Sequence, residues 1–259
     1  VSNTIGSLSG SGTLNLSSGI TLSTGFNNSD STFSGPIEGS GGSLGKVGTG
    51  TLTLTGLQTY TGSTAVSAGS LVYSNNVIPL TSGFTGTGTL AIQPTSGSTF
   101  SSTLNTSSFT FASSLSGLTL GSATNTANLY IGNAITIAGP ISVYSGNMGT
   151  GAALTSTTSG SGILIKSSGG ITVGGNITTN GGDITIWANS GGSSTGGIVV
   201  NNNTTLSSTG GWITLAGSAN NVSISGLAST STNGTTLPVG YAENANSITG
   251  ISIGSSLTS

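Results

Sequence analysis

The feature that most constrains the fold is a short stretch, bracketed by glycines, in which apolar and hydroxyl residues alternate. Residues 51–55 read TLTLT, and Gly48, Gly50 and Gly56 flank them. Alternation with period two predicts a β-strand with one buried face. Glycine permits the positive φ angles that tight turns need. The stretch therefore predicts a short strand between two turns.

The same pattern recurs at fixed intervals. The form G-x-G-T-L-x-[LI] begins at Gly10, Gly48 and Gly86, so the same 38-residue interval separates each copy from the next. A second repeat, with a 29-residue offset, relates TNGGDITI (179–186) to STGGWITL (208–215). Offsets in the range of roughly 20–50 residues are typical of solenoids, propellers and repeat arrays.

Short apolar segments separated by Gly- or Asn-bearing corners favour a solenoid with three strands per coil. The corners include Gly-Gly pairs at 169–170, 174–175, 181–182, 191–192, 196–197 and 210–211. We predict an all-β, right-handed parallel β-solenoid (β-helix) with Gly- and Asn-rich corners. Coils of roughly 20–29 residues would give about 9–13 coils and a rod on the order of 45–60 Å long. A β-sandwich or a propeller is the alternative, but the double glycines and the offsets are hard to place in a sandwich.

The pattern divides the chain into four regions. Residues 1–75 form a solenoid region with the strongest repeat, and residues 76–130 form irregular Ser/Thr-rich coils. Residues 131–225 return to regular coils. Residues 226–259 are predicted to be a loop or insertion, followed by a last strand at 248–253.

The composition removes most catalytic chemistry. The chain has no His and no Cys, which excludes Ser-His triads and thiol nucleophiles. Its six charged residues are Asp30, Glu38, Lys46, Lys166, Asp183 and Glu243. We therefore predict a protein that is not an enzyme, with no catalytic residue, no metal ligand and no cofactor. The one carboxylate pair that could approach across a turn, as glycoside hydrolysis requires, is Asp30 with Glu38. Asp183 is predicted to be a turn residue, and each lysine could pair with an acid.

The composition also limits the classes of partner that the protein can bind. There is no basic patch for nucleic acid and no apolar run of about 18 residues that would form a membrane-spanning helix. The net charge of −2 puts little repulsion between copies, so end-to-end self-association through open β-edges is expected.

Aromatic residues are the remaining candidates for binding. Phe84, Phe100, Phe109 and Phe111 cluster in the irregular region, where we expect core packing or an aromatic ladder; a carbohydrate-stacking surface is the alternative. Trp187 and Trp212 are expected to be packed or rim residues, with exposed binding platforms as the alternative.

Two parts of the sequence resemble known families. The segments FSGPI (33–37), LGK (44–46), GTGTLTLTG (48–56), TYTGST (59–64) and VSAGSL (66–71) resemble the autotransporter-associated β-strand repeat. The segments GSATNTAN (121–128) and AGPI (138–141), with the block 162–224, are similar to filamentous-haemagglutinin-like surface proteins. These resemblances imply a secreted protein, extracellular or on the bacterial outer surface.

The expected function is therefore a structural one, a β-solenoid scaffold or adhesin stalk. Two alternatives stay open. One is the subunit of a homopolymeric extracellular filament. The other is a module that binds glycans on a host or environmental surface.

Overall fold

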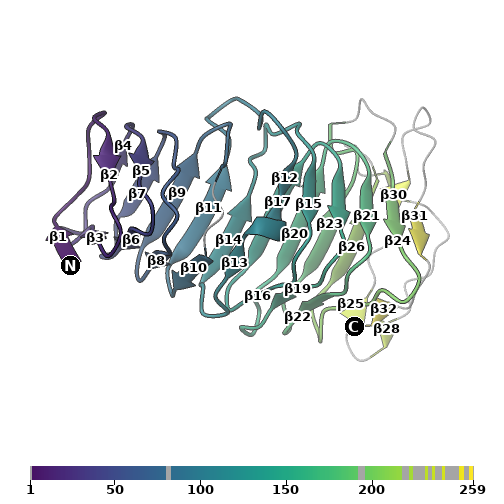
Figure 1. Ribbon diagram of the computed structural model, residues 1–259. Coiled ribbons are helices and arrows are strands. Elements are labelled where there is room, and N and C mark those ends of the chain that lie inside the picture. Colours follow the sequence, from purple (N-terminus) through teal and green to yellow (C-terminus); the bar gives the residue numbers. More distant parts are fainter. Residues whose placement is uncertain are drawn as a thin grey trace.

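The chain folds into a stack of parallel β-coils, which confirms the predicted β-solenoid (Figure 1). The computed structural model describes residues 2–79, 83–191 and 196–217, together with the backbone of the short strands β27 to β32. Within these residues the helical structure is a single 3-10 turn, η1 (Thr106–Ser108). The strands are short, as expected from the brief alternating runs of the sequence.

Each coil has three sides, numbered in the order in which the chain passes through them. The second side, described first, is one continuous parallel sheet. Its strands are, in order, β4 (Ser31–Phe33), β7 (Thr51–Leu54), β9 (Ser70–Ser74), β11 (Thr89–Gln93), β14 (Gly117–Leu120), β17 (Ile141–Ser145), β20 (Ile163–Ser167), β23 (Ile184–Trp187) and β26 (Ile213–Ala216).

The first side is made of two sheets that follow each other along the stack, with β13 next to β16. The earlier sheet contains β1 (Ser2–Ile5), β3 (Thr21–Thr24), β6 (Ser43–Lys46), β8 (Thr64–Val66), β10 (Gly83–Gly86) and β13 (Thr110–Phe111). The later sheet contains β16 (Ile135–Ile137), β19 (Leu154–Ser156), β22 (Ile177–Thr179), β25 (Leu206–Ser207) and β32 (Leu257–Thr258).

The third side begins with the pair β2 (Leu14–Asn15) and β5 (Ile37–Glu38). Further along the stack it is a six-stranded sheet. The strands of that sheet are β12 (Leu104–Asn105), β15 (Leu129–Ile131), β18 (Met148–Thr150), β21 (Ile171–Val173), β24 (Ile198–Val200) and β31 (Ile251–Ile253). Two antiparallel pairs lie outside the coils: β27 (Val222–Ser223) with β30 (Tyr241–Ala242), and β28 (Ser231–Thr232) with β29 (Thr235–Thr236).

The stack has about eight coils, fewer than the number expected from the sequence. The expected number was too high because the chain leaves the stack near its end. On the third side, Ile198 of β24 pairs with Ile251 of β31. The chain between these two neighbouring strands contains the two antiparallel pairs that lie outside the coils. At about 4.8 Å per step, eight coils make a rod of roughly 40 Å.

The coils differ in length, as the register of the second side shows. The shortest ones run from Leu52 to Leu71 and from Leu71 to Leu90, and the longest one runs from Ile184 to Ile213. The longest coil is the 29-residue offset of the sequence. The 38-residue interval between the second and third G-x-G-T-L copies is the sum of the two shortest coils.

The first copy of the 38-residue repeat does not fit this register. Its Leu14 lies on the third side of the coil, paired with Ile37 in β5. Gly10 itself bridges Phe33, which pairs with Leu54 at the end of β7. The first copy is therefore displaced along the coil relative to the other two, and equal spacing there does not mean equal position.

The core is a set of apolar rows that run along the stack. On the second side, the inward residues of successive coils, such as Leu52, Leu71, Leu90, Leu118 and Ile141, are all buried and paired in register. Each buried Leu or Ile side chain contributes on the order of 1.5–3 kcal/mol relative to exposure. A single coil has no such partners, so the coils stabilise one another.

The last strand predicted at 248–253 is present as β31, which pairs with β24. The predicted insertion at 226–247 lies largely outside the described residues.

Candidate functional site

Lys46 is a buried lysine that holds two corners together. It ends β6, and its side chain is 1% exposed. Its Nζ donates to the carbonyl oxygens of Val47 at 2.6 Å, Gly48 at 2.8 Å and Ala68 at 3.3 Å. Burial lowers the pKa of Lys46, and the negative charge of Asp30 opposes that shift. The three donors of the ammonium group are therefore used on the backbone of two successive coils.

Asp30 and Asp183 perform one structural task at two places. Each stands directly before a strand of the second side, β4 or β23. Asp30 Oδ1 accepts a hydrogen bond from the backbone N–H of Thr51 at 2.6 Å, and Asp183 Oδ1 accepts one from that of Trp212 at 2.8 Å. Both bonds link one coil to the next, and Asp183 lies between the corner glycines 181–182 and β23.

The predicted pair of Asp30 and Glu38 is not formed. Asp30 lies at the corner before β4, whereas Glu38 lies in β5 on the third side, beyond the corner at 34–36. Both side chains are exposed. The turn between them changes the direction of the chain from one side of the coil to the next, which separates the carboxylates. Glu243 lies outside the described residues.

Lys166 and Trp187 form a second interaction between coils. Tyr144, Lys166 and Trp187 occupy consecutive partner positions on the outer face of the second side. The Nζ of Lys166 lies 4.3 Å from the centroid of the Trp187 ring, a cation–π contact. Trp187 is partly buried, as expected for a packed aromatic residue, whereas Trp212 at the corner before β26 is 46% exposed.

The phenylalanine cluster is core, as predicted. Phe84 lies 5.6 Å from Phe111 in a stacked pair and 6.0 Å from Phe109 edge to face, measured between ring centroids. Tyr73 joins the cluster from the preceding coil, 5.9 Å from Phe84. Phe84, Phe100 and Phe109 are buried. These three rings therefore belong to the core, and Phe100 and Phe109 also border a cavity.

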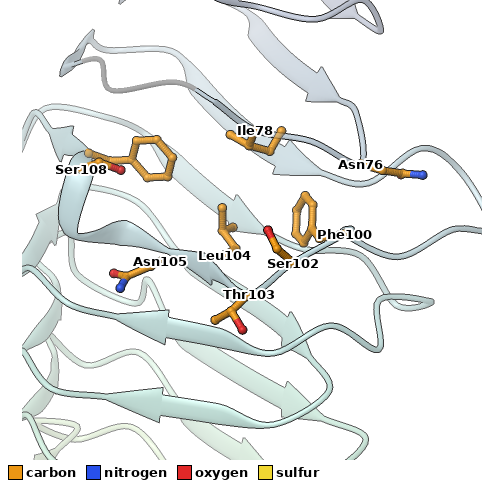
Figure 2. Close-up of a pocket in the computed structure, with 9 residues that line it drawn as sticks. Asn76, Ile78, Phe100, Ser102, Thr103, Leu104, Asn105 and Ser108 are labelled. Atoms are coloured by element: carbon orange, nitrogen blue, oxygen red, sulfur yellow. The ribbon is translucent and has the colours of Figure 1, made fainter.

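A cavity of about 160 Å³ lies beside this cluster, next to β12, which is the first strand of the six-stranded sheet on the third side. Figure 2 shows Ile78, Phe100 and Leu104 around the opening, with Ser102 between Phe100 and Leu104. The remaining lining residues are Asn76, Thr103, Asn105, Ser108 and Phe109. None of these side chains is charged.

A wider trough of about 240 Å³ lies on the outer face of the second side, across β9, β11, β14 and β17. It exists because the outward residues there are small, among them Ala91 and Gly117. Two of its hydroxyl groups bond to each other: the side-chain oxygens of Ser70 and Thr89 are 2.6 Å apart. The other hydroxyl groups of its lining belong to Ser116, Thr119 and Ser142.

The rest of the described part of the chain offers no further centre. It holds no group of three or more His, Cys, Asp or Glu that could bind a metal ion. Among the same residues, no helix has the length and apolar character needed to cross a membrane. Three buried polar atoms there lack a hydrogen-bond partner, Thr24 Oγ1, Gln58 Oε1 and Ser145 Oγ, and they belong to different coils.

The fold and these sites define a class, a parallel β-solenoid in which charged side chains bind the backbone of the protein itself. No family model matches the chain, and neither a curated protein nor a solved structure matches it significantly. The two family resemblances stay predictions from the residues that carry them.

Little in the sequence indicated the cavity. Its lining comes from two neighbouring coils, and a hydrophobic pattern reports which residues are buried but not where a gap remains between them. The buried state of Lys46 was also missed. The glycines around it, in LGKVGTG, were the available signal, because they leave carbonyl oxygens uncovered.

Proposed function

We propose that the chain is a non-catalytic structural protein, a β-solenoid scaffold or adhesin stalk that is secreted and stands on the bacterial outer surface. The observation that supports this most strongly is the use of its charged residues. Lys46, Asp30 and Asp183 bond to backbone groups of the next coil rather than facing a cleft. Residues placed in this way stabilise a rod.

Asparagine side chains add to the same role. Asn128 Oδ1 accepts hydrogen bonds from the backbone N–H and the side chain of Asn147, and Asn147 Oδ1 accepts one from the N–H of Gly170. Asn28 and Asn176 accept equivalent bonds from residues of the next coil. Neutral amides thus take the place of salt bridges between coils. Such contacts depend little on ionic strength, which suits an extracellular stalk.

A filament subunit is the second candidate, and one feature favours it. Strand β1 is the last strand of its sheet and pairs only with β3 within the described residues. An unpaired parallel edge is a template for another chain. In a longer polypeptide a preceding coil would cover this edge, and in the isolated chain a second copy can do so.

The test is negative-stain electron microscopy of the purified chain across a concentration series. We expect short rods of about 40 Å, eight coils at the strand spacing, that do not lengthen. Long uniform fibres would contradict the stalk and favour the filament. In that case Thr4→Lys, which places a charge on the exposed β1 edge, should abolish the fibres. Thr85→Lys is the matched control, because Thr85 is exposed in β10, whose two edges are already paired with β8 and β13.

The enzyme alternative is tested separately with polysaccharide substrates. We expect no release of reducing ends by the wild-type chain. Release that disappears in Asp30→Asn or Glu38→Gln would overturn the non-catalytic assignment.

A further inference from the structure

We propose that the cavity beside Phe100 binds one neutral sugar ring of a glycan. This inference rests on the adhesin form of the proposed function and adds a ligand class and a position to it. The site lies on the third side of the coil, between residues 76–78 and strand β12.

The size of the cavity sets the size of the ligand. Its volume is about 160 Å³. A protein cavity of roughly 150 Å³ accommodates one six-membered ring such as benzene. The cavity can therefore hold a single ring and has no room for a longer chain, whose remaining units would extend into solvent.

The lining combines two kinds of surface. Ile78, Phe100 and Leu104 form an apolar wall, and Ser102 brings a hydroxyl group to its edge (Figure 2). A pyranose ring has the same division, with C–H groups on its faces and hydroxyl groups around its rim. A wholly apolar ring would leave the polar edge unused, and a charged ring would find no opposite charge.

The polar groups at the edge have unused hydrogen-bonding capacity. In the described part of the chain, the hydroxyls of Ser102 and Ser108 make no hydrogen bond to another residue. Asn105 Oδ1 accepts a hydrogen bond from the backbone N–H of Ser107 at 2.9 Å, and Asn76 Oδ1 accepts one from that of Thr95 at 2.9 Å. Both amides point away from the opening in Figure 2. The serine hydroxyls are therefore the polar groups available to a ligand.

The position in the stack is also distinctive. The coil from Leu90 to Leu118 is longer than both of its neighbours, which run from Leu71 to Leu90 and from Leu118 to Ile141. The additional residues include η1, and its N-cap Asn105 is one of the pocket residues. Insertions on a rigid scaffold are where binding residues are commonly carried.

The experiment is an NMR titration of the full ¹⁵N-labelled chain with the methyl glycosides of glucose, galactose, mannose and N-acetylglucosamine. We expect at least one of them to give saturable shifts of the backbone amides of residues 102–109. Ser102→Phe places a ring in the cavity and should weaken binding at least tenfold. Ser40→Phe adds the same side chain at an exposed corner and should bind as the wild type does.

Three results would overturn the proposal. The first is the absence of saturable shifts with all four glycosides. The second is glycoside binding by Ser102→Phe that is as strong as binding by the wild type. The third is that the wild-type chain binds benzyl alcohol at this site but none of the sugars. Each of these leaves the rod proposal intact, because electron microscopy tests that proposal independently. Retained ¹⁵N spectra of the variants show that they fold.

Discussion

At the scale of single residues, the two lysines show how differently the same side chain can be used. Lys46 is buried and donates to three carbonyl oxygens, whereas Lys166 lies over the ring of Trp187 on the outer face. Burying an ammonium group is costly unless its donors are satisfied. The three carbonyls offset that cost for Lys46, so removal of its amine leaves several backbone acceptors without a donor.

Lys46→Met is therefore expected to lower the free energy of unfolding by about 2–4 kcal/mol. Lys166→Met, the matched control, removes a partly exposed cation–π contact and should cost less than about 1 kcal/mol. Urea denaturation followed by circular dichroism measures both. Equal effects of the two substitutions would show that the carbonyl contacts of Lys46 contribute little.

At the scale of elements, the corners between the first and second sides explain the 29-residue repeat. The side chains of Thr179 and Ser208 are buried and donate to the carbonyl oxygens of Gly182 and Gly211. The residue before each of these glycines is also a glycine, and its φ angle is 76° in the first corner and 108° in the second, in the left-handed region. The sequence hydroxyl-x-Gly-Gly therefore gives the same side-chain hydrogen bond in both corners, although the backbones differ, because Thr209 has a positive φ of 47° in the second corner and its counterpart Asn180 does not in the first.

The second glycine of each corner is required by contact with the previous coil. A Cβ at Gly182 would overlap the carbonyl oxygen of Ser161, and one at Gly211 would come too close to that of Gly182. Gly182→Ala is expected to destabilise the protein by about 1–3 kcal/mol, because the backbone must shift. Gly12→Ala is the control, since nothing lies within 4 Å of its Cβ position. Thermal unfolding that is equally affected by both changes would contradict this account.

At the scale of the whole molecule, alkaline pH acts on a buried hydroxyl cluster that joins neighbouring coils. Tyr60 OH lies 2.6 Å from Thr64 Oγ1 and 2.5 Å from Tyr73 OH. Burial raises the pKa of both tyrosines above the ordinary value of 10.0, and for Tyr73 well above it. Above pH 10 these tyrosines lose their protons in the unfolded chain but keep them in the folded protein. The free energy of unfolding therefore falls as pH rises. Lys46 has the opposite effect on the free energy of unfolding, because its lowered pKa makes the folded state lose the proton at a lower pH than the unfolded state. This effect ends near pH 10.5, where the unfolded lysine also loses its proton.

We therefore expect the free energy of unfolding to decrease with pH between about 10.5 and 12, by up to ~1.4 kcal/mol per pH unit for each buried tyrosine. Tyr73→Phe should make this slope smaller by about one such contribution, because the substituted ring has no proton to release. Urea denaturation at a series of pH values gives the slope. An unchanged slope in Tyr73→Phe would show that Tyr73 does not titrate on unfolding.

Local patterns predicted the parts of this fold that depend on neighbours in the sequence. The alternation at 51–55 became β7, with Leu52 and Leu54 buried, and double glycines such as 181–182 and 210–211 became corners. The 29-residue offset is one coil. These predictions succeed because strand alternation and turn conformation are fixed within a few residues, and because stacking repeats the same local structure in each coil.

Contacts between coils, in contrast, follow from the three-dimensional arrangement. The stacking displaced the first G-x-G-T-L copy to another position along the coil and separated Asp30 from Glu38. It also buried Lys46 against carbonyls of two coils and opened a cavity beside Phe100. Strands, corners and the solenoid class could be predicted from local sequence. The sites could not, because the register between coils depends on the length of every corner before it, and one corner of a different length moves all later contacts.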